Sequence, residues 1–458
     1  MILSFTLMVV SVNAQEKRKK KQPIIPVRFL ENYEYLKDTS QVSNALDHLK
    51  FIPLNDAKTS YLSIGGEVKV FYESTRNRDD EGEGYLLTRL MVHADLHIGN
   101  NFRIFIQPAS GFESFREAPP RSIDRDELFL LNAFVDYKIL NSERNTFTTR
   151  IGRQELNYGR GRLVTIREGP NVRHYWEGIS LLYNSKDWKA DAFFTKYGTN
   201  DFGILDNPVL DSDETFWGSY LQSKKAIVFK GKLDAYYLGF IDDTSQFFNA
   251  DGKETRHTIG VRVYKKGTHW DYDVEAAGQL GTVGDSDITA FGFFGEVGYT
   301  FDSEDVIKKR IGLKVDYFTG DRDSTDTKVN TFNPMYPRQG YYRGAGALYA
   351  ANFWDVHPSF TIEKTNEFSF LLDWTWYWRT SVEDGLYIGG SGIPLLAPND
   401  SNKEYLGSQL DFQFTYTFNK YFKGSINYSH FYSGGFVKDN PSLMEISDFL
   451  NLMLHFRF

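Results

Sequence analysis

Arginine is concentrated between residues 150 and 173, in a segment whose side chains are suited to binding carboxylates. The segment has no lysine, two acids (Glu155 and Glu168), and six arginines: Arg150, Arg153, Arg160, Arg162, Arg167 and Arg173. Its formal charge is therefore +4 (six minus two), whereas the whole chain carries −8. A guanidinium binds a carboxylate through two parallel hydrogen bonds and stays charged when it is partly desolvated. The segment predicts a path for an anionic polymer or for smaller anionic solutes; the alternative is an external loop held by Arg–Asp pairs and lipopolysaccharide.

Other reactive motifs are weak or missing in the sequence. The nine histidines show no zinc-binding spacing, and there is no Gly-x-Ser-x-Gly elbow or phosphate-binding glycine loop. A hydrolase built on His430 and a neighbouring serine is a minor alternative. Five acids could bind Ca²⁺, but they lack a calcium-loop order and are better explained as solvated charge: Asp201, Asp206, Asp211, Asp213 and Glu214. We therefore predict no catalytic residue, no metal site and no cofactor.

Composition points to strands, and it excludes several classes of protein. Aromatic residues make up 16% of the 458 residues, with 38 Gly and no Cys. Aromatic residues favour strands, and glycines favour turns. A pI near 5.7 argues against a nucleic-acid partner bound through bulk positive charge. Without cysteine, lipid attachment at a processed cysteine is impossible.

The elements that would position these residues are strands with two different faces. From about residue 61, segments of roughly ten residues alternate apolar and polar side chains. The alternation is clearest in residues 84–98, 367–379 and 406–418. A soluble sandwich also alternates, but here the outward faces would be bulky and aromatic, as lipid-facing strands are.

Connections between these segments alternate in length as well. Eight tight turns, such as the one at residues 99–101, separate nine longer polar loops, including those near residues 158–176, 243–255 and 281–287. Seventeen connections require 18 strands with both termini on the short-turn side, which is typical of outer-membrane barrels. The sequence thus predicts an all-β fold, a transmembrane antiparallel β-barrel of about 18 strands of the outer-membrane porin type, with a water-filled lumen.

Cations that lie opposite an apolar face would line this lumen. The strand alternation selects Arg89, Arg262, Arg379, Lys69 and Lys314. The same alternation turns Arg150 inward but places Arg153 on the lipid side, unless a bulge intervenes or the residue lies above the bilayer. Each cation could instead be an ordinary wall residue paired with an acid. The predicted lumen acids are Asp95, Asp316 and Asp373.

The two ends of the chain carry targeting signals. Residues 1–14 are predicted to be a signal peptide, with a disordered apolar terminus as the alternative. Residues 15–60 would form a periplasmic N-terminal segment, and residues 61–458 the barrel. The last strand ends on the aromatic Phe458, which resembles the element recognised by the barrel-assembly machinery.

Several motifs resemble those of the alginate-export porin family. The most specific is IGRQELNYG at residues 151–159, followed by RLV at 162–164, REGPNVR at 167–173 and WEG at 176–178, where Glu177 replaces the usual Asp. Weaker matches follow in the expected order at residues 331–337, 355–358, 384–387 and 405–411. The resemblance covers residues 60–458.

This resemblance implies a monomeric 18-stranded barrel in the outer membrane, in contact with its lipids and lipopolysaccharide. An arginine-lined constriction would pass polyuronate by passive diffusion. The resemblance assigns selectivity to Arg153, Arg162, Arg167 and Arg173. Two alternatives remain at this point: a general uptake porin for oligosaccharides or organic acids, and a plugged membrane enzyme or adhesion barrel.

Overall fold

A computed structural model describes residues 24–77, 82–301, 304, 306–338, 348–387, 392, 394–398, 401–440 and 446–458. The predicted signal peptide, residues 1–14, lies outside the described residues. Helices are short in the described part of the chain, and none of them has the length and apolar character needed to cross a membrane.

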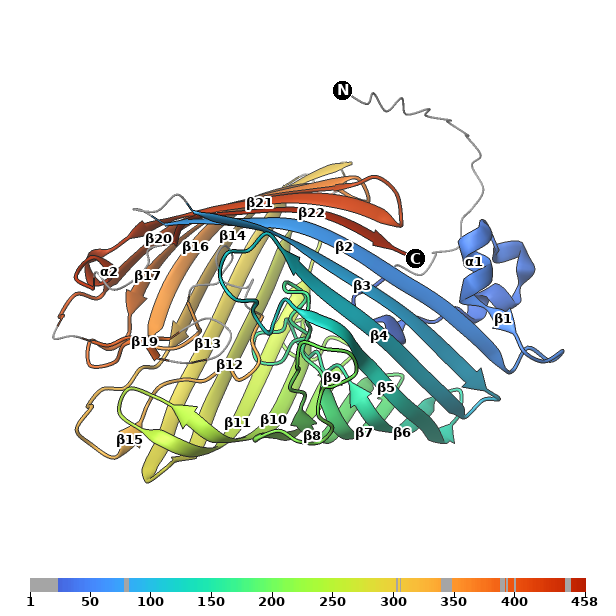
Figure 1. The fold of residues 1–458 in the computed structure, drawn as a ribbon, viewed down its shortest axis with the longest axis horizontal. Helices are drawn as coiled ribbons and strands as arrows, with labels where there is room; N and C mark the ends of the chain where they lie inside the picture. The colour runs from blue at the N-terminus through green and yellow to red at the C-terminus, as the bar shows by residue number, and fades with distance from the viewer. Residues whose placement is uncertain are drawn as a thin grey trace.

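The described residues form a closed antiparallel β-barrel (Figure 1). Twenty strands share the main sheet; two of them, β1 (Ile52–Pro53) and β15 (Lys328–Val329), are two-residue additions, and the other eighteen make the wall. The wall strands are β2 Tyr61–Asn77, β3 Glu83–Ile98, β4 Phe102–Ser114, β5 Asp126–Asn141, β6 Asn145–Gln154, β7 Trp176–Ser185, β8 Trp188–Tyr197, β9 Glu214–Ser223, β10 Lys232–Gln246, β11 Asp251–Lys266, β12 Trp270–Val283, β13 Ser286–Phe301, β14 Ile307–Phe318, β16 Phe353–Lys364, β17 Phe368–Arg379, β20 Tyr405–Thr417, β21 Phe422–Ser433 and β22 Ile446–Arg457.

Pairing of the first and last wall strands closes the barrel. β22 pairs with β2 in antiparallel fashion, in a register that places Arg457 opposite Glu67. The wall therefore has no unpaired edge strand. A small hairpin of β18 (Leu386–Tyr387) and β19 (Pro394–Leu396) lies outside the main sheet, and α2 (Gly435–Lys438) follows β21. The predicted fold class and strand number are confirmed.

Burial follows the predicted two-face alternation. In β3, Arg89 and His93 are buried on the inner face, whereas Leu90 and Val92 are exposed on the outer face. Leu406 in β20 is an exception: the alternation of residues 406–418 predicts it on the apolar outer face with Leu410 and Phe412, but it is buried. Gly407, with φ +143, lies at a register shift between β17 and β20, and this shift reverses the alternation.

Two connections predicted as long loops are tight hairpins. β10 ends at Gln246 and β11 begins at Asp251, while β12 and β13 are separated only by residues 284–285. The prediction of long loops there is wrong, because polarity alone does not distinguish a polar strand residue from a loop residue. Ser245 and Glu254, for example, are buried and hydrogen-bonded to each other on the inner face.

Residues 24–60 pack at the short-turn end of the barrel, where α1 and β1 lie near the C-terminus in Figure 1. The segment contains η1 (Arg28–Leu30), η2 (Glu34–Lys37), η3 (Thr39–Gln41) and α1 (Ala45–Lys50), followed by β1. The Asn44 side chain caps α1 and also accepts a hydrogen bond from Tyr421 of the β20–β21 turn at 2.9 Å. Lys420 of the same turn pairs with Asp47 at 3.2 Å.

Part of this segment reaches into the barrel. Phe29 packs edge-on against the inward-facing rings of Phe105 and Phe134, with centroids 5.8 and 5.2 Å away. Arg28 donates hydrogen bonds to the carbonyl oxygens of Gly66 and Phe458 at 3.1 and 2.6 Å. The N-terminal segment is thus attached both to the barrel interior and to the strand pair that closes the barrel.

We expect Phe29→Ala to loosen residues 24–31. The change removes a buried ring from an aromatic cluster, which typically costs about 3–5 kcal/mol. Limited proteolysis of the detergent-solubilised protein should show faster cleavage in this segment. Tyr35→Ala, at an exposed ring of the same segment, is the control and should leave the cleavage rate unchanged; equal protection in both variants would contradict the packing role of Phe29.

The barrel interior differs from the predicted water-filled lumen along β8–β13. Inward-facing aromatic side chains there pack on residues from the long loops and form one large hydrophobic cluster that includes Phe193, Phe216, Tyr236 and Tyr336. The wall therefore encloses a packed core on one side, and this core positions the loop described next.

Candidate functional site

The arginine-rich segment is a loop inside the barrel. The chain leaves β6 after Gln154 and returns to the wall at Trp176, the first residue of β7; we refer to residues 155–175 as the lumen loop. Tyr158 stacks on two inward-facing wall rings, Phe193 and Tyr220, at centroid distances of 5.7 and 4.7 Å. Leu163 and Val164 belong to the same buried cluster. These apolar contacts fix the loop body and leave its charged side chains to reach the wall.

The first half of the lumen loop is anchored on β12 and β13. Arg162 is fully buried, and its Nη1 lies 2.8 Å from Asp273 Oδ1 and 3.1 Å from Glu275 Oε2. Arg160, two residues earlier and more exposed, pairs with Glu296 of β13. Arg162 thus links the loop to β12.

The tip of the loop is anchored on β2, β3 and β22. Glu168 Oε1 lies 2.9 Å from Arg89 Nη2 and 2.7 Å from Arg457 Nη2. Lys69 donates hydrogen bonds to the backbone carbonyls of Glu168 and Gly169 at 2.9 and 2.8 Å. Because β2 and β12 lie on opposite sides of the barrel in strand order, the loop crosses the lumen from wall to wall.

Arg173 connects the tip to the base of the loop. Its Nη1 donates to Glu155 at 3.0 Å and to the Pro26 carbonyl at 3.1 Å, and its Nη2 contacts Glu168. Burial would raise the pKa of Glu168, but Arg173 and Arg89 outweigh it and hold that pKa below its ordinary value. Burial would likewise lower the pKa of Arg173, but Glu168 and Glu155 raise it. Both groups are therefore charged at neutral pH.

Arg153 lies beside an irregularity in the wall. Gly152 and Gly178 face each other across β6 and β7 with φ of +130 and +155, and Arg153 and Glu177 form the next pair. Ile151 is exposed on the outer face, whereas Arg153 is buried, 4.5 Å from the Tyr175 ring and 2.7 Å from Glu177. Its guanidinium is thus enclosed between the loop and the wall.

Arg167 has a different environment from the other arginines of the loop. Its φ is +52, and its Nη2 donates to the Val172 carbonyl at 3.1 Å. Within the described part of the chain, no carboxylate lies at ion-pair distance from its guanidinium, and its Nε has no hydrogen-bond partner. Arg167 is therefore the loop arginine with charge least compensated by a neighbouring acid.

The remaining predicted cations are wall residues with local partners. Arg150 donates to Asp136 at 2.7 Å, and Arg262 to Asp234 at 2.9 Å. Arg379 donates to backbone carbonyls of the loop that follows β17, including that of Lys403 at 2.8 Å. These contacts are those of side chains that stabilise the wall and its loops.

The predicted lumen acids also have partners. Asp95 lies 2.7 Å from Arg103, which the sequence did not single out. Asp373 lies 3.2 Å from Lys314. Asp316 and Asp355 are cross-strand neighbours on β14 and β16, and His357 Nε2 lies 3.0 Å from Asp355.

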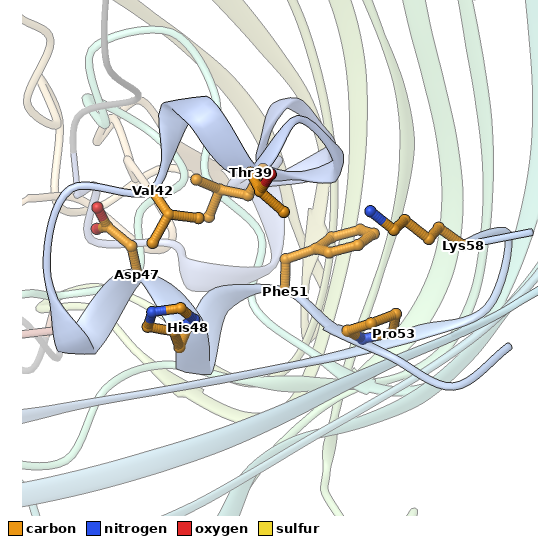
Figure 2. Close-up of a pocket in the computed structure, with 8 residues that line it drawn as sticks. Thr39, Val42, Asp47, His48, Phe51, Pro53 and Lys58 are labelled. Carbon is orange, nitrogen blue, oxygen red and sulfur yellow. The ribbon is translucent and has the colours of Figure 1, made fainter. Parts of the chain in front are cut away.

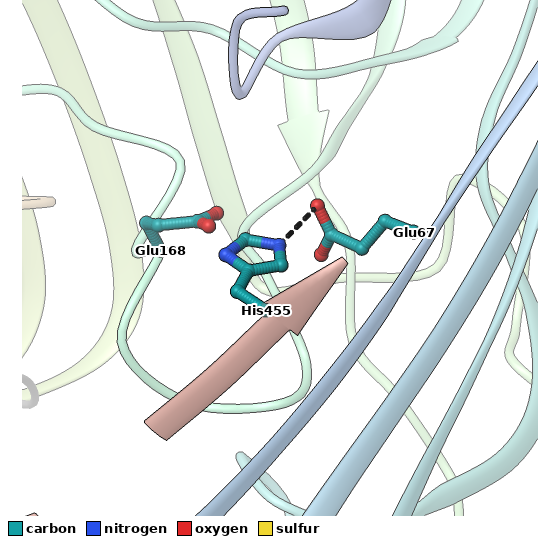
Figure 3. A group of neighbouring side chains, drawn as sticks. All are labelled: Glu67, Glu168 and His455. Atoms are coloured by element: carbon teal, nitrogen blue, oxygen red, sulfur yellow. Dashed lines mark ion pairs between the residues drawn. The ribbon is translucent and has the colours of Figure 1, made fainter. Parts of the chain in front are cut away.

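Two groups in the described residues bring three possible metal-ligand atoms within 4.8 Å of one another. The first is Glu67, Glu168 and His455, which Figure 3 shows with the His455 ring between the two carboxylates. Its carboxylates already bind Arg89 and Arg457, so it is an ion-pair network. The second is Asp316, Asp355 and His357. The acids predicted as a possible calcium site, residues 201–214, belong to neither group.

The alternative of a hydrolase built on His430 has no geometric support. His430 Nδ1 lies 2.8 Å from Asp448, while the preceding Ser429 donates its hydroxyl proton to Asp411. Consecutive residues of a strand point to opposite faces, which separates the hydroxyl from the imidazole.

Sequence reasoning missed Glu67 and Arg457, both central to the anchor of the loop tip. Glu67 and Lys69 are two positions apart in β2, as are His455 and Arg457 in β22. Residues two positions apart share one face of a strand, so the strand period could have placed all four inward. Their convergence on Glu168 could not be read from the sequence, because Arg457 and Glu168 are 289 positions apart.

A second concave site lies outside the lumen. A cavity of about 400 Å³ in the N-terminal segment is lined by Leu36, Thr39, Val42, Asp47, His48, Phe51, Pro53 and Lys58. Figure 2 shows these lining residues as sticks. None of the residues that line the cavity belongs to the lumen loop.

Comparisons with known proteins agree with this architecture. The family model described as Alginate export matches residues 60–445. Pseudomonas aeruginosa OpdO is similar in structure, with a TM-score of 0.57, 10% identity, and 90% of this chain and 99% of that chain covered. Acinetobacter baumannii OccAB3 gives a TM-score of 0.56 at 10% identity, covering 87% and 99%.

A third similar structure is Pseudomonas aeruginosa OccK2 (OpdF) in complex with glucuronate, with a TM-score of 0.55, 10% identity, and 90% and 98% covered. At such identities the likeness concerns the fold. No curated protein matches the sequence.

Proposed function

Because this chain belongs to the alginate export family, we propose that it passes an anionic polysaccharide of the alginate-like polyuronate class. The protein is an outer-membrane β-barrel channel for anionic solutes. Polyuronates carry one carboxylate on every sugar unit. A channel for them needs cationic groups spaced along the lumen that bind each carboxylate weakly and release it again.

The observation that carries this proposal is the arginine-rich loop that crosses the lumen. A solute must pass beside this loop, and arginine is the side chain best suited to carboxylates. The structurally similar OccK2 was crystallised with glucuronate, a uronic acid, which supports the same class of solute for this chain.

We propose different roles for the loop arginines. Arg162, Arg173 and Arg153 are held by carboxylates and shape the constriction. Arg167, without such a partner among the described residues, supplies attraction for a passing carboxylate. The wall cations Arg89, Arg150, Arg262, Arg379, Lys69 and Lys314 add a general positive field, balanced by Asp95, Asp316 and Asp373.

Passage is passive in this proposal, so the direction follows the concentration gradient. Uptake of oligosaccharides or organic acids is the second candidate, because the same carboxylate-binding groups would serve it. We propose a monomer that performs no covalent chemistry, binds no cofactor, contacts lipopolysaccharide and is inserted by the barrel-assembly machinery. Residues 15–60 are proposed to lie on the periplasmic side, following a signal peptide.

Arg167→Gln is expected to reduce the chloride-over-potassium permeability ratio of the reconstituted channel roughly two- to threefold, because it removes a cation from the constriction. Reversal potentials in a KCl gradient across a planar bilayer measure this ratio. Arg125→Gln removes an equal charge from a half-exposed loop residue paired with Glu127 and is the matched control. A wild-type channel without anion preference would refute the proposed function, and an unchanged reversal potential in Arg167→Gln would refute the role of this residue.

A further inference from the structure

Three guanidinium groups converge on one carboxylate at the tip of the lumen loop. Arg89 of β3, Arg457 of β22 and Arg173 of the loop each direct their Nη2 atom to Glu168. We call these three residues the three-arginine site. Such convergence of cations from separate elements on a single carboxylate is the arrangement expected of a carboxylate receptor.

The three guanidinium groups are also held in place without Glu168. Glu67 accepts from Nε of Arg89 at 2.7 Å and from Nε of Arg457 at 2.9 Å. Glu155 accepts from Nη1 of Arg173 at 3.0 Å. Each arginine therefore has a second carboxylate that fixes its orientation, and the Nη2 atoms would still point to one place if Glu168 withdrew.

Glu168 is the most accessible member of this network. Its side chain is 34% exposed, whereas those of Arg89, Arg173 and Glu67 are at most 2% exposed. It lies next to the exposed Gly169 at the turn of the loop. A carboxylate approaching through the lumen would meet Glu168 before any of the arginines.

Charge also favours an exchangeable anion at this position. The network contains four cations, the three arginines and Lys69, against three acids, Glu67, Glu155 and Glu168. Withdrawal of Glu168 would leave an excess of two positive charges in a mostly buried place. Such an excess requires another anion.

We propose that Glu168 is an internal competitor: it occupies the three-arginine site when the channel is empty, and a uronate carboxylate of the passing saccharide displaces it. This inference rests on the proposed function, and it adds a gate to it. Because Glu168 is part of the loop tip, its displacement removes the carboxylate contacts of the tip with Arg89 and Arg457 and leaves the tip held only by backbone contacts such as those to Lys69, which loosens it. Arrival of the solute is thereby coupled to widening of the lumen, and an empty channel stays narrow.

The test uses Glu168→Gln in the full chain with glucuronate as the probe. An internal ligand that occupies the site nine-tenths of the time lowers apparent affinity about tenfold, so removing its charge should strengthen glucuronate binding by roughly that factor. The measured quantities are the glucuronate concentration that halves chloride current in a planar bilayer, and the Kd from calorimetry in detergent. Glu143→Gln makes the same charge change at an exposed short turn and should match the wild type.

A double variant, Glu168→Gln with Arg457→Gln, identifies the site. It should lose the gain in affinity, because one of the three receptor groups is gone. Heat-modifiable migration on gels checks that each variant is a folded barrel. The proposal is supported by a gain in Glu168→Gln that disappears in the double variant.

Two results would overturn the proposal and leave the channel function intact: equal or weaker glucuronate binding in Glu168→Gln, and a gain that persists in the double variant. Failure of the proposed function looks different. In that case the wild type itself shows no anion preference and no effect of glucuronate on current.

Discussion

Replacing Arg162 with alanine is expected to raise the single-channel conductance several-fold and to lower the thermal stability of the barrel. The side chain is fully buried, and it joins the lumen loop to Asp273 and Glu275 on β12. Removing one partner of a buried ion pair leaves uncompensated charge and typically costs about 3–5 kcal/mol. The loop would lose its attachment to this wall and leave more of the lumen open to ions. Conductance in planar bilayers and the midpoint of thermal unfolding in detergent measure the two effects.

Arg160→Ala is the matched control for this prediction. Arg160 comes from the same stretch of loop and also pairs with a wall acid, but its side chain is 41% exposed. Half-exposed ion pairs contribute little to stability, so both conductance and midpoint should change far less. If Arg162→Ala behaves like Arg160→Ala, the buried anchor does not hold the loop.

Gly178→Val is expected to prevent formation of the folded barrel. Gly178 has φ +155 and faces Gly152, which has φ +130, across β6 and β7. A Cβ atom at Gly178 would overlap the carbonyl oxygen of Phe194, an atom of the β8 backbone that cannot move without breaking the ladder. A β-branched residue adds a strained backbone to this overlap. Refolding yield, read from heat-modifiable migration on gels, measures the effect.

Gly278→Val provides the comparison for this variant. Gly278 also lies in a wall strand, β12, but nothing lies within 4 Å of the Cβ that a side chain would add there. This variant should refold with nearly the wild-type yield. Normal refolding of Gly178→Val would show that the glycine pair does not set the path of the wall at this point.

The wall of the barrel was predictable because its physical cause is local. A strand with lipid on one side and the lumen on the other must alternate, so residues 84–98 revealed β3 without any knowledge of its neighbours. Errors arose where polarity had two explanations. Residues 243–255 are rich in polar side chains, of which Ser245 and Glu254 are buried on the inner face, and polarity alone does not distinguish such strand residues from a solvent-exposed loop.

The candidate site was only partly predictable for the opposite reason. The arginine-rich segment was visible in the sequence, but the partners of its side chains come from strands distant along the chain, as with Arg162 and Asp273, 111 positions apart. The path of the loop also depends on aromatic packing around Tyr336, which has no periodic signal. Arg153 shows most clearly where prediction from strand alternation fails. Alternation alone places Arg153 on the lipid face, but the backbone of the pair Gly152 and Gly178 turns it to the buried side.

The wall-to-wall course of the lumen loop has a mechanical consequence. Arg162 is ion-paired to the wall on one side and Glu168 is ion-paired to it on the other, so the loop forms a cross-link between the two sides of the barrel. Lateral pressure from the bilayer can change the shape of the barrel cross-section. Any such change must stretch or compress this cross-link. Membrane tension and the width of the constriction are thus linked through two sets of charged contacts, and loosening either set would make the cylinder more compliant.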